Sequence, residues 1–160
     1  MEKTQKRKKK KDANVGIRGG DINLYLAFSK TFLGIPKLKS FSHIKIKSNH
    51  FSVVLHCRQH WVAIYSTKKS FEIFDSLGFL NIKNCLGKNV LTFISTYASG
   101  KNIKCNHTVQ SSKSNLCGLF CVYYITRRDQ GHSFEKIMSS FSSNLNHNDS
   151  LVLNFINKLK

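Results

Sequence analysis

Three short runs of aromatic and β-branched residues lie between residues 51 and 75, and they constrain the fold of this chain most strongly. The runs cover residues 51–56, 60–65 and 70–75. Val, Ile, Phe, Tyr and Trp are the residue types that strands favour. The polar breaks between the runs, at residues 57–59 and 66–69, have the length of hairpin loops. The sequence therefore predicts three antiparallel strands in a meander.

Helices are predicted on both sides of this meander. Asp21 can cap a helix that ends near Gly34 and Pro36. The other predicted elements are a helix at residues 90–97, a strand at 103–109 and helices at 116–126, 134–141 and 151–159. The segment 116–126 is apolar almost all round, which is typical of a helix buried in the centre of a domain. This order predicts an α+β fold, with a central mixed or antiparallel sheet packed against the buried helix and with peripheral helices.

Positive charge is concentrated at the N-terminus. The chain has 160 residues with 26 Lys and Arg against 8 Asp and Glu, a net charge of +18, and residues 1–11 carry +6 of it. Such a block repels itself, so we expect residues 1–20 to be a disordered basic arm and linker before one domain at 21–160. The arm suits a nuclear-import signal or a phosphate-binding arm, with a solubilising tail as the alternative. Its cations are Lys6, Arg7, Lys8, Lys9, Lys10 and Lys11.

Composition disfavours several classes of protein. No apolar stretch has the length of a membrane-spanning helix, and none follows the basic N-terminus as in a signal peptide, so no membrane partner and no secretion are expected. The five cysteines are an odd number without the spacing of a disulfide scaffold. His56, Cys57 and His60 have no second closely spaced ligand pair elsewhere, so no metal site is expected.

Cys117 is the first candidate for chemistry. It follows a polar loop and stands at the predicted start of the buried helix. Unpaired N–H groups and the positive end of the dipole at a helix N-terminus favour a thiolate over a thiol. Cys117 is therefore a candidate nucleophile. The alternative is a small buried residue, which is how we interpret Cys121 one turn later.

A nucleophilic thiol needs a base and a group that orients the base. His60 opens a predicted strand beside the only tryptophan, and Asp75 closes the neighbouring strand, where it could orient an imidazole. Glu72 lies at odd spacing from Asp75 and is expected on the opposite face of the strand. A strand-edge histidine and a turn-initiating aspartate are the structural alternatives for His60 and Asp75.

These residues stand in motifs that resemble a known family. The motifs are His-Trp at 60–61, Phe-Asp-Ser-Leu-Gly at 74–78, Val-Gln-Ser at 109–111, Asn-Leu-Cys-Gly-Leu-Phe-Cys at 115–121 and Phe-Leu-Gly at 32–34. Together they are similar to the adenovirus protease (adenain) family and, more widely, to the clan of SUMO-specific proteases. The resemblance spans about residues 21–128 and implies a papain-like or adenain-like cysteine protease fold.

The resemblance also implies a role for each site residue. Cys117 would be the nucleophile, His60 its general base and Asp75 the orienting carboxylate. Gln110 and the backbone N–H of Cys117 would form the oxyanion hole. Adenovirus enzymes have Glu at the place of Asp75, whereas the SUMO-protease branch has Asp.

The activity implied by the resemblance is that of an endopeptidase. It would cleave viral capsid or core precursors at Gly-Gly-type sites during virion maturation, through a thioester acyl-enzyme, in the host nucleus and the virion. The implied source is a DNA virus or a virus-like mobile element. The alternatives are a deconjugating protease for ubiquitin-like proteins and, from another class, a basic nucleic-acid-binding module without catalysis.

Partners and cofactors follow from charge and from the family. No cofactor is required, a monomer is expected, and DNA bound to the basic surface would bring enzyme and basic precursors together. Adenovirus enzymes are activated by a viral peptide that forms a disulfide, and Cys105 lies in roughly that region. The sequence Ile-Arg-Gly-Gly at 17–20 is similar to the family's recognition pattern. It predicts self-processing after the pair Gly19 and Gly20, with a flexible linker as the alternative.

Overall fold

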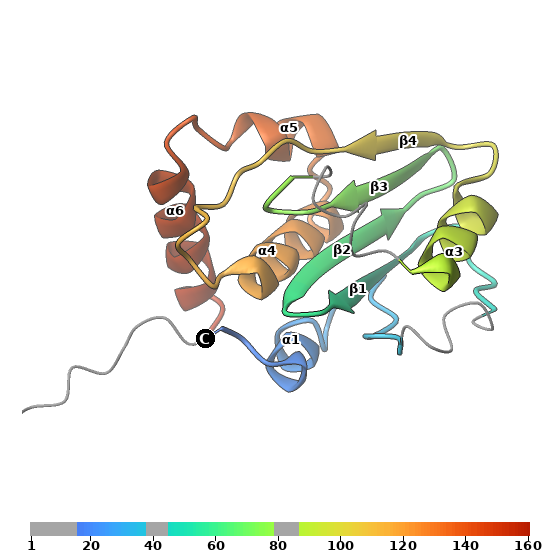
Figure 1. The fold of residues 1–160 in the computed structure, drawn as a ribbon, viewed down its shortest axis with the longest axis horizontal. Coiled ribbons are helices and arrows are strands. Elements are labelled where there is room, and N and C mark those ends of the chain that lie inside the picture. Colours follow the sequence, from blue (N-terminus) through green and yellow to red (C-terminus); the bar gives the residue numbers. More distant parts are fainter. Residues whose placement is uncertain (1–15, 38–44, 79–86) are drawn as a thin grey trace, which may run out of the picture.

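The computed structural model describes residues 16–37, 45–78 and 87–160. Residues 1–15 of the predicted arm and linker lie outside these described residues, whereas residues 16–20, also predicted to be disordered, lie within them and the first helix already starts at Gly19. The protein is an α+β structure built around a four-stranded mixed sheet (Figure 1). The elements in chain order are α1 Gly19–Tyr25, β1 Phe51–Cys57, β2 His60–Ser66, β3 Ser70–Phe74, α3 Lys88–Ala98, β4 Asn102–Cys105, α4 Cys117–Asp129, α5 Phe134–Ser139 and α6 Leu145–Asn157.

The sheet has the strand order β1-β2-β3-β4. The predicted meander of β1, β2 and β3 is confirmed, because each of these strands pairs antiparallel with the next. β4 pairs parallel with β3, which makes the sheet mixed. The hairpin between β1 and β2 turns at Arg58, whose φ of 58° is in the left-handed region.

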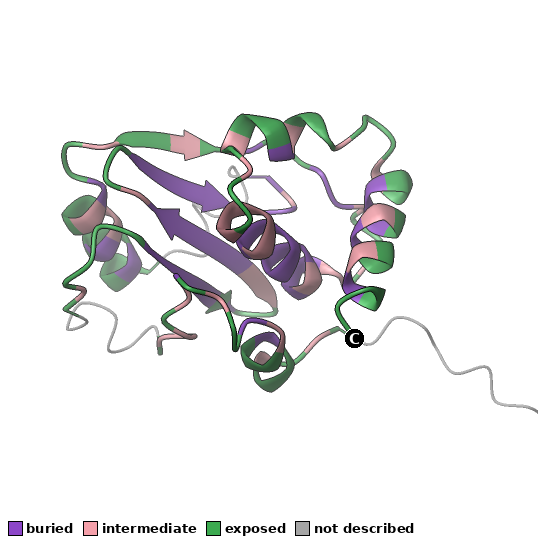
Figure 2. Ribbon diagram, turned by 180° about the vertical axis from the view of Figure 1, so that it is seen from behind, coloured by how far each residue is buried: buried purple, intermediate pink, exposed green. Residues whose placement is uncertain are grey.

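Two hydrophobic cores lie on the two faces of the sheet. One face packs against α4, whose residues are buried along most of the helix, and α1, α5 and α6 lie around it (Figure 2). The other face is covered by α3 through Val90, Phe93 and Ala98. The apolar run at 116–126 therefore becomes the central helix, as predicted, because it is enclosed by the sheet and by peripheral helices.

Three predicted boundaries differ from the structure. The helix expected from Asp21 to Gly34 starts at Gly19 and ends at Tyr25, because Ser29 accepts hydrogen bonds from the amides of Thr31 and Phe32 and turns the chain. The strand expected at 103–109 ends at Cys105. The last helix starts at Leu145, six residues before its predicted start, because the side chain of Asn144 caps it. Within the described ranges, no helix combines the length and apolar character needed to cross a bilayer.

Candidate active site

A cleft of about 770 Å3 opens at the N-terminal end of α4. One wall is the hairpin between β1 and β2, which carries His60 and Trp61, and a second is the loop from Gln110 to Cys117. The third wall is the segment at residues 16–19, just before and at the start of α1. The cleft thus joins parts of the chain that are far apart in the sequence, and it contains every candidate catalytic residue except the fully buried Asp75.

His60, which lines the cleft, forms a short ionic contact with the buried Asp75. Nε2 of His60 lies 2.6 Å from Oδ1 of Asp75, and the His60 side chain is 17% exposed whereas that of Asp75 is fully buried. The side chain of Cys117 also interacts with His60 and raises the pKa of the imidazole. Because Nε2 is bonded to Asp75, Nδ1 is the ring nitrogen left for the thiol. The three residues therefore lie in the order of a nucleophile, a base and an orienting acid.

The electrostatic surroundings favour the protonated form of His60. Burial by itself lowers the pKa of the imidazole, but its hydrogen bond to Asp75, its interaction with Cys117 and the charge of Asp75 outweigh this effect, and the pKa of His60 rises to about 9. An imidazolium is thus stabilised at neutral pH, next to a thiol at a helix N-terminus. This arrangement can hold a thiolate–imidazolium pair.

Asp75 is fixed by the chain on both sides of it. Its Oδ1 also accepts the N–H of Leu77 at 2.9 Å. The buried side chain of Asn106 bonds both the backbone N–H of Asp75, at 2.9 Å, and its carbonyl, at 2.7 Å. The other carboxylate oxygen, Oδ2, is buried and has no hydrogen-bond partner among the described residues. Asn106 was not predicted from the sequence, since an Asn after a strand is also an ordinary loop residue.

Gln110 is buried beside the cleft in a defined orientation. Its Oε1 accepts the hydroxyl of Ser76 at 2.5 Å, so its Nε2 points the other way, where it donates to the carbonyl and hydroxyl of Ser114 at 2.8 and 3.1 Å. The backbone amides of Val109 and Gln110 both bond the carbonyl of Ser76. The loop after β3 and the loop before α4 are therefore held together, and a side-chain amide donor lies on the wall shared with Cys117.

Cys117 is the first residue of α4 and is buried, with 7% of its surface exposed. No side chain caps the N-terminus of this helix. Directly behind the thiol, Gly118 leaves room for Ile17, because a Cβ at position 118 would lie 2.2 Å from the Ile17 side chain. A glycine is therefore required where residues 16–19 lie against the helix.

The remaining candidates lie in different surroundings. Gly19 and Gly20 form the first turn of α1, and Gly19 lies against Trp61. Cys121 is fully buried in α4, and burial raises its pKa. Cys105 is an exposed residue at the end of β4, but partial burial of its thiol raises its pKa. In the described ranges, no group of three or more His, Cys, Asp or Glu side chains could hold a metal ion.

Two searches for related sequences gave no match: no protein-family model and no curated protein matches this chain. The structure is similar to the central domain of the uncharacterized Lpg1148 protein from Legionella pneumophila. The TM-score is 0.57 at 13% sequence identity, over 91% of this chain and 99% of that chain. At this identity the similarity shows a shared fold, and the chemistry has to be argued from the site itself.

Proposed function

We propose that the protein is a cysteine endopeptidase of the adenain type, with Cys117, His60 and Asp75 as its catalytic residues. The observation that carries the proposal is that His60 and Cys117 line one cleft, where His60 bonds the buried carboxylate of Asp75 and also interacts with the Cys117 thiol. A cysteine with a structural role alone needs neither a histidine partner nor a cleft.

The reaction follows from these positions. Nδ1 of His60 takes the proton of Cys117, and the thiolate attacks the scissile carbonyl carbon. The oxyanion of the tetrahedral intermediate accepts the backbone N–H of Cys117 and a side-chain N–H of Gln110, which gives up its bond to the Ser114 hydroxyl. Each such donor contributes on the order of 3 kcal/mol to stabilising the transition state.

The intermediate collapses by breaking the carbon–nitrogen bond, and His60 gives its proton to the leaving amine. A thioester then joins Cys117 to the acyl part of the substrate. His60 deprotonates a water molecule that attacks this thioester, and the thiolate leaves and regains a proton. Asp75 holds the imidazole in place and stabilises its protonated form throughout.

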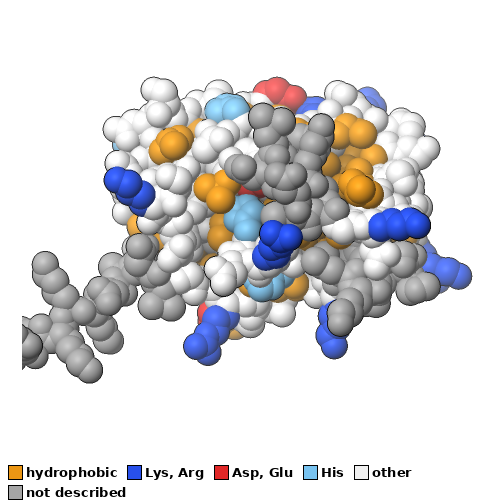
Figure 3. Space-filling view, viewed as in Figure 1, with side chains coloured by type: hydrophobic (Ala, Val, Ile, Leu, Met, Phe, Trp, Pro, Cys, Tyr) orange, Lys and Arg blue, Asp and Glu red, His pale blue; other side chains and the backbone are white. Residues whose placement is uncertain are grey.

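The substrate class follows the family resemblance. We propose Gly-Gly-containing sites in viral capsid or core precursors, because the close approach of Gly19 to Trp61 leaves little lateral space in this part of the cleft. DNA is proposed as a co-localising partner in the nucleus and the virion, since Lys and Arg outnumber acidic side chains on the visible face of the molecule (Figure 3). A salt-sensitive rate on basic protein substrates is the expected sign of that partner.

The test is cleavage of a peptide containing Ile-x-Gly-Gly-x, alongside SUMO and ubiquitin precursors, by the full chain and by Cys117→Ala. We expect the peptide to be cut by the unmodified protein only, and an alkylating agent to abolish the cut. Preferential cleavage of the folded precursors would favour the deconjugating alternative. Salt-sensitive DNA binding with no cleavage and no alkylation of Cys117 would leave the nucleic-acid-binding module as the explanation.

A further inference from the structure

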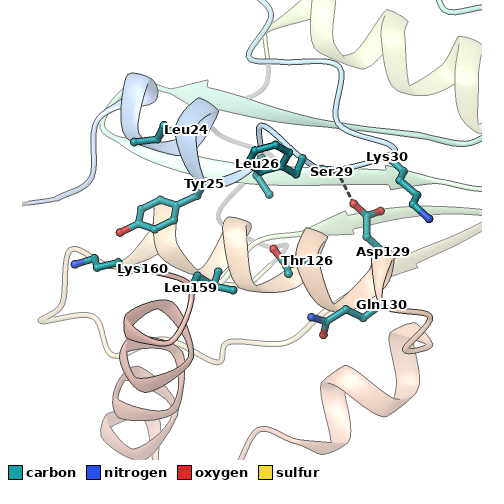
Figure 4. Close-up of a pocket in the computed structure, with 11 residues that line it drawn as sticks. Leu24, Tyr25, Leu26, Ser29, Lys30, Thr126, Asp129, Gln130, Leu159 and Lys160 are labelled. Atoms are coloured by element: carbon teal, nitrogen blue, oxygen red, sulfur yellow. Dashed lines mark hydrogen bonds between the residues drawn. The ribbon is translucent and has the colours of Figure 1, made fainter.

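A second cavity, of about 570 Å3, lies at the opposite end of α4 from Cys117 and shares no lining residue with the cleft (Figure 4). Its walls come from α1, from the turn that follows it and from the last residues of the chain. Thr126 of α4 and Gln130, the residue that follows this helix, form its base. Thr126 lies nine positions after Cys117, which corresponds to about 14 Å along a helix. The cavity is therefore separate from the proposed chemistry.

Several large apolar side chains that line this cavity are exposed to solvent. Phe28 is 98% exposed, Leu24 74% and Leu159 42%, and all three line the cavity. A fully exposed Phe removes no apolar surface from water, so Phe28 makes no hydrophobic contribution to the stability of the free protein. Contiguous exposed apolar surface of this kind marks interaction sites.

The exposure of Phe28 is built into the fold. The residue after it, Ser29, donates to Asp129 of α4 at 2.5 Å, and its backbone N–H bonds the carbonyl of Leu26. Thr31 also donates to Asp129, at 2.8 Å. Ser29 thus fixes the turn both to α4 and to Leu26, the residue that ends α1, and the ring of Phe28 is held out from the surface.

Charge at the rim indicates what can cover this surface. Lys30 and Lys160 line the cavity, and neither forms an ion pair among the described residues. The carboxylate of Asp129 is engaged by Ser29 and Thr31. The mouth therefore combines apolar walls with unpaired positive charge.

We propose that this cavity, with Phe28 at its edge, docks a segment of a partner protein that has bulky apolar side chains flanked by acidic residues. The apolar walls would bury the former, and Lys30 and Lys160 would pair with the latter. A second copy of this chain is a poor occupant because each chain carries +18, and among the described acidic residues only Asp21 and Glu135 are exposed. Nucleic acid is disfavoured because apolar walls offer nothing to phosphates.

The test is fluorescence anisotropy with the full chain and a fluorescein-labelled peptide, Asp-Glu-Leu-Phe-Asp-Leu-Leu-Glu-Asp. A matched peptide has Ser at each Leu and Phe. We expect binding of the first peptide only, and Phe28→Ser to raise its Kd about tenfold. Lys30→Glu should raise the Kd about fivefold and reduce its salt dependence.

Leu91→Ser is the control variant, since Leu91 is 54% exposed on α3 and lies outside the cavity. It should leave the Kd unchanged. Phe28 makes no buried contact, so Phe28→Ser should keep the melting temperature. Equal binding of both peptides, equal effects of Phe28→Ser and Leu91→Ser, no binding at all, or self-association through this surface would each overturn the proposal. None of these outcomes depends on whether Cys117 is catalytic.

Discussion

Two buried acids lie close together in the sequence, Glu72 in the middle of β3 and Asp75 directly after the strand, and their carboxylates have different hydrogen-bond partners. Both oxygens of Glu72 have donors: Arg128 bonds both, at 2.7 and 3.0 Å, and the hydroxyls of Tyr124 and Ser70 add one bond each. For Asp75, one oxygen accepts two bonds and the other accepts none among the described residues.

The difference separates a structural acid from one suited to chemistry. Glu72 joins β3 to α4 and lines neither the cleft nor the second cavity, and its charge is balanced inside the protein by Arg128. Among the described residues, the charged partner of Asp75 is a histidine, and that histidine interacts with a thiol in the cleft. A buried carboxylate that depends on a titratable partner is the arrangement that can respond to a reaction.

The largest expected effect is the loss of stability when Glu72 is replaced. Glu72→Gln leaves the buried Arg128 without its counter-ion, so the free energy of unfolding should fall by about 3 to 5 kcal/mol in urea denaturation. The control is Glu135→Gln, which removes an exposed pair with Lys104 and should cost less than about 1 kcal/mol. Equal costs for the two variants would break the comparison.

Asp75→Asn should affect catalysis more than stability. The Asn oxygen can still accept from His60 and Leu77, but the negative charge that stabilises the imidazolium is lost, so stability should fall, and by less than for Glu72→Gln. Without the negative charge the imidazolium is less favoured, and kcat/KM on the Gly-Gly peptide should fall by about tenfold to 100-fold. A large loss of stability with unchanged kcat/KM would show that Asp75 is structural.

The pH dependence of stability should also distinguish the Asp75–His60 pair from the Glu72–Arg128 pair. The pKa of His60 is raised from 6.5 to about 9 in the folded protein. Its stabilising contribution is therefore complete below pH 6.5 and is lost as the pH rises through 9. The advantage of the unmodified protein over His60→Gln should shrink by about 2 kcal/mol across this range, after screening of the partly exposed ring. A constant difference from pH 6 to 10 would contradict this coupling, as Arg128 stays charged throughout.

The smallest expected effect is at one donor of Glu72. Ser70→Ala removes a hydrogen bond of 2.9 Å to a buried carboxylate that keeps its other donors, and should cost about 1 kcal/mol of unfolding free energy. Ser95→Ala, on the exposed surface of α3, should cost less than about 0.5 kcal/mol. Peptide cleavage should be unaffected by either substitution, and a fall with Ser70→Ala alone would mean that the two acids are coupled.

Local pattern predicts much of this fold. The aromatic and β-branched runs predict the three antiparallel strands, and the apolar segment at 116–126 predicts the central helix, because burial on both sides leaves a continuous apolar signal. The first helix was predicted too long, since Phe28 and Phe32 extend an apolar spacing that a hydrogen-bonded turn interrupts. Local sequence patterns do not predict that this turn is anchored, because its partner Asp129 lies 100 residues away.

The candidate site is predictable only in part for the same reason. Cys117, His60 and Asp75 have residue types and local positions that suggest chemistry, and the structure brings them together. Asn106 and Ile17 act through contacts with distant parts of the chain and have no local signature of their own. The alternation of side chains indicates a face of a strand, but it does not identify which loop will fold over that face.

The contact between Ile17 and Gly118 makes the beginning of the domain part of its own cleft. A cut after Gly20 would therefore discard one of the three walls while leaving the thiol and the histidine in place. Processing at that bond would therefore change the shape of the cleft irreversibly, in addition to releasing the basic residues. Any affinity tag or fusion joined close to Ile17 would likewise be attached at the mouth of the cleft, where it would compete with incoming peptide.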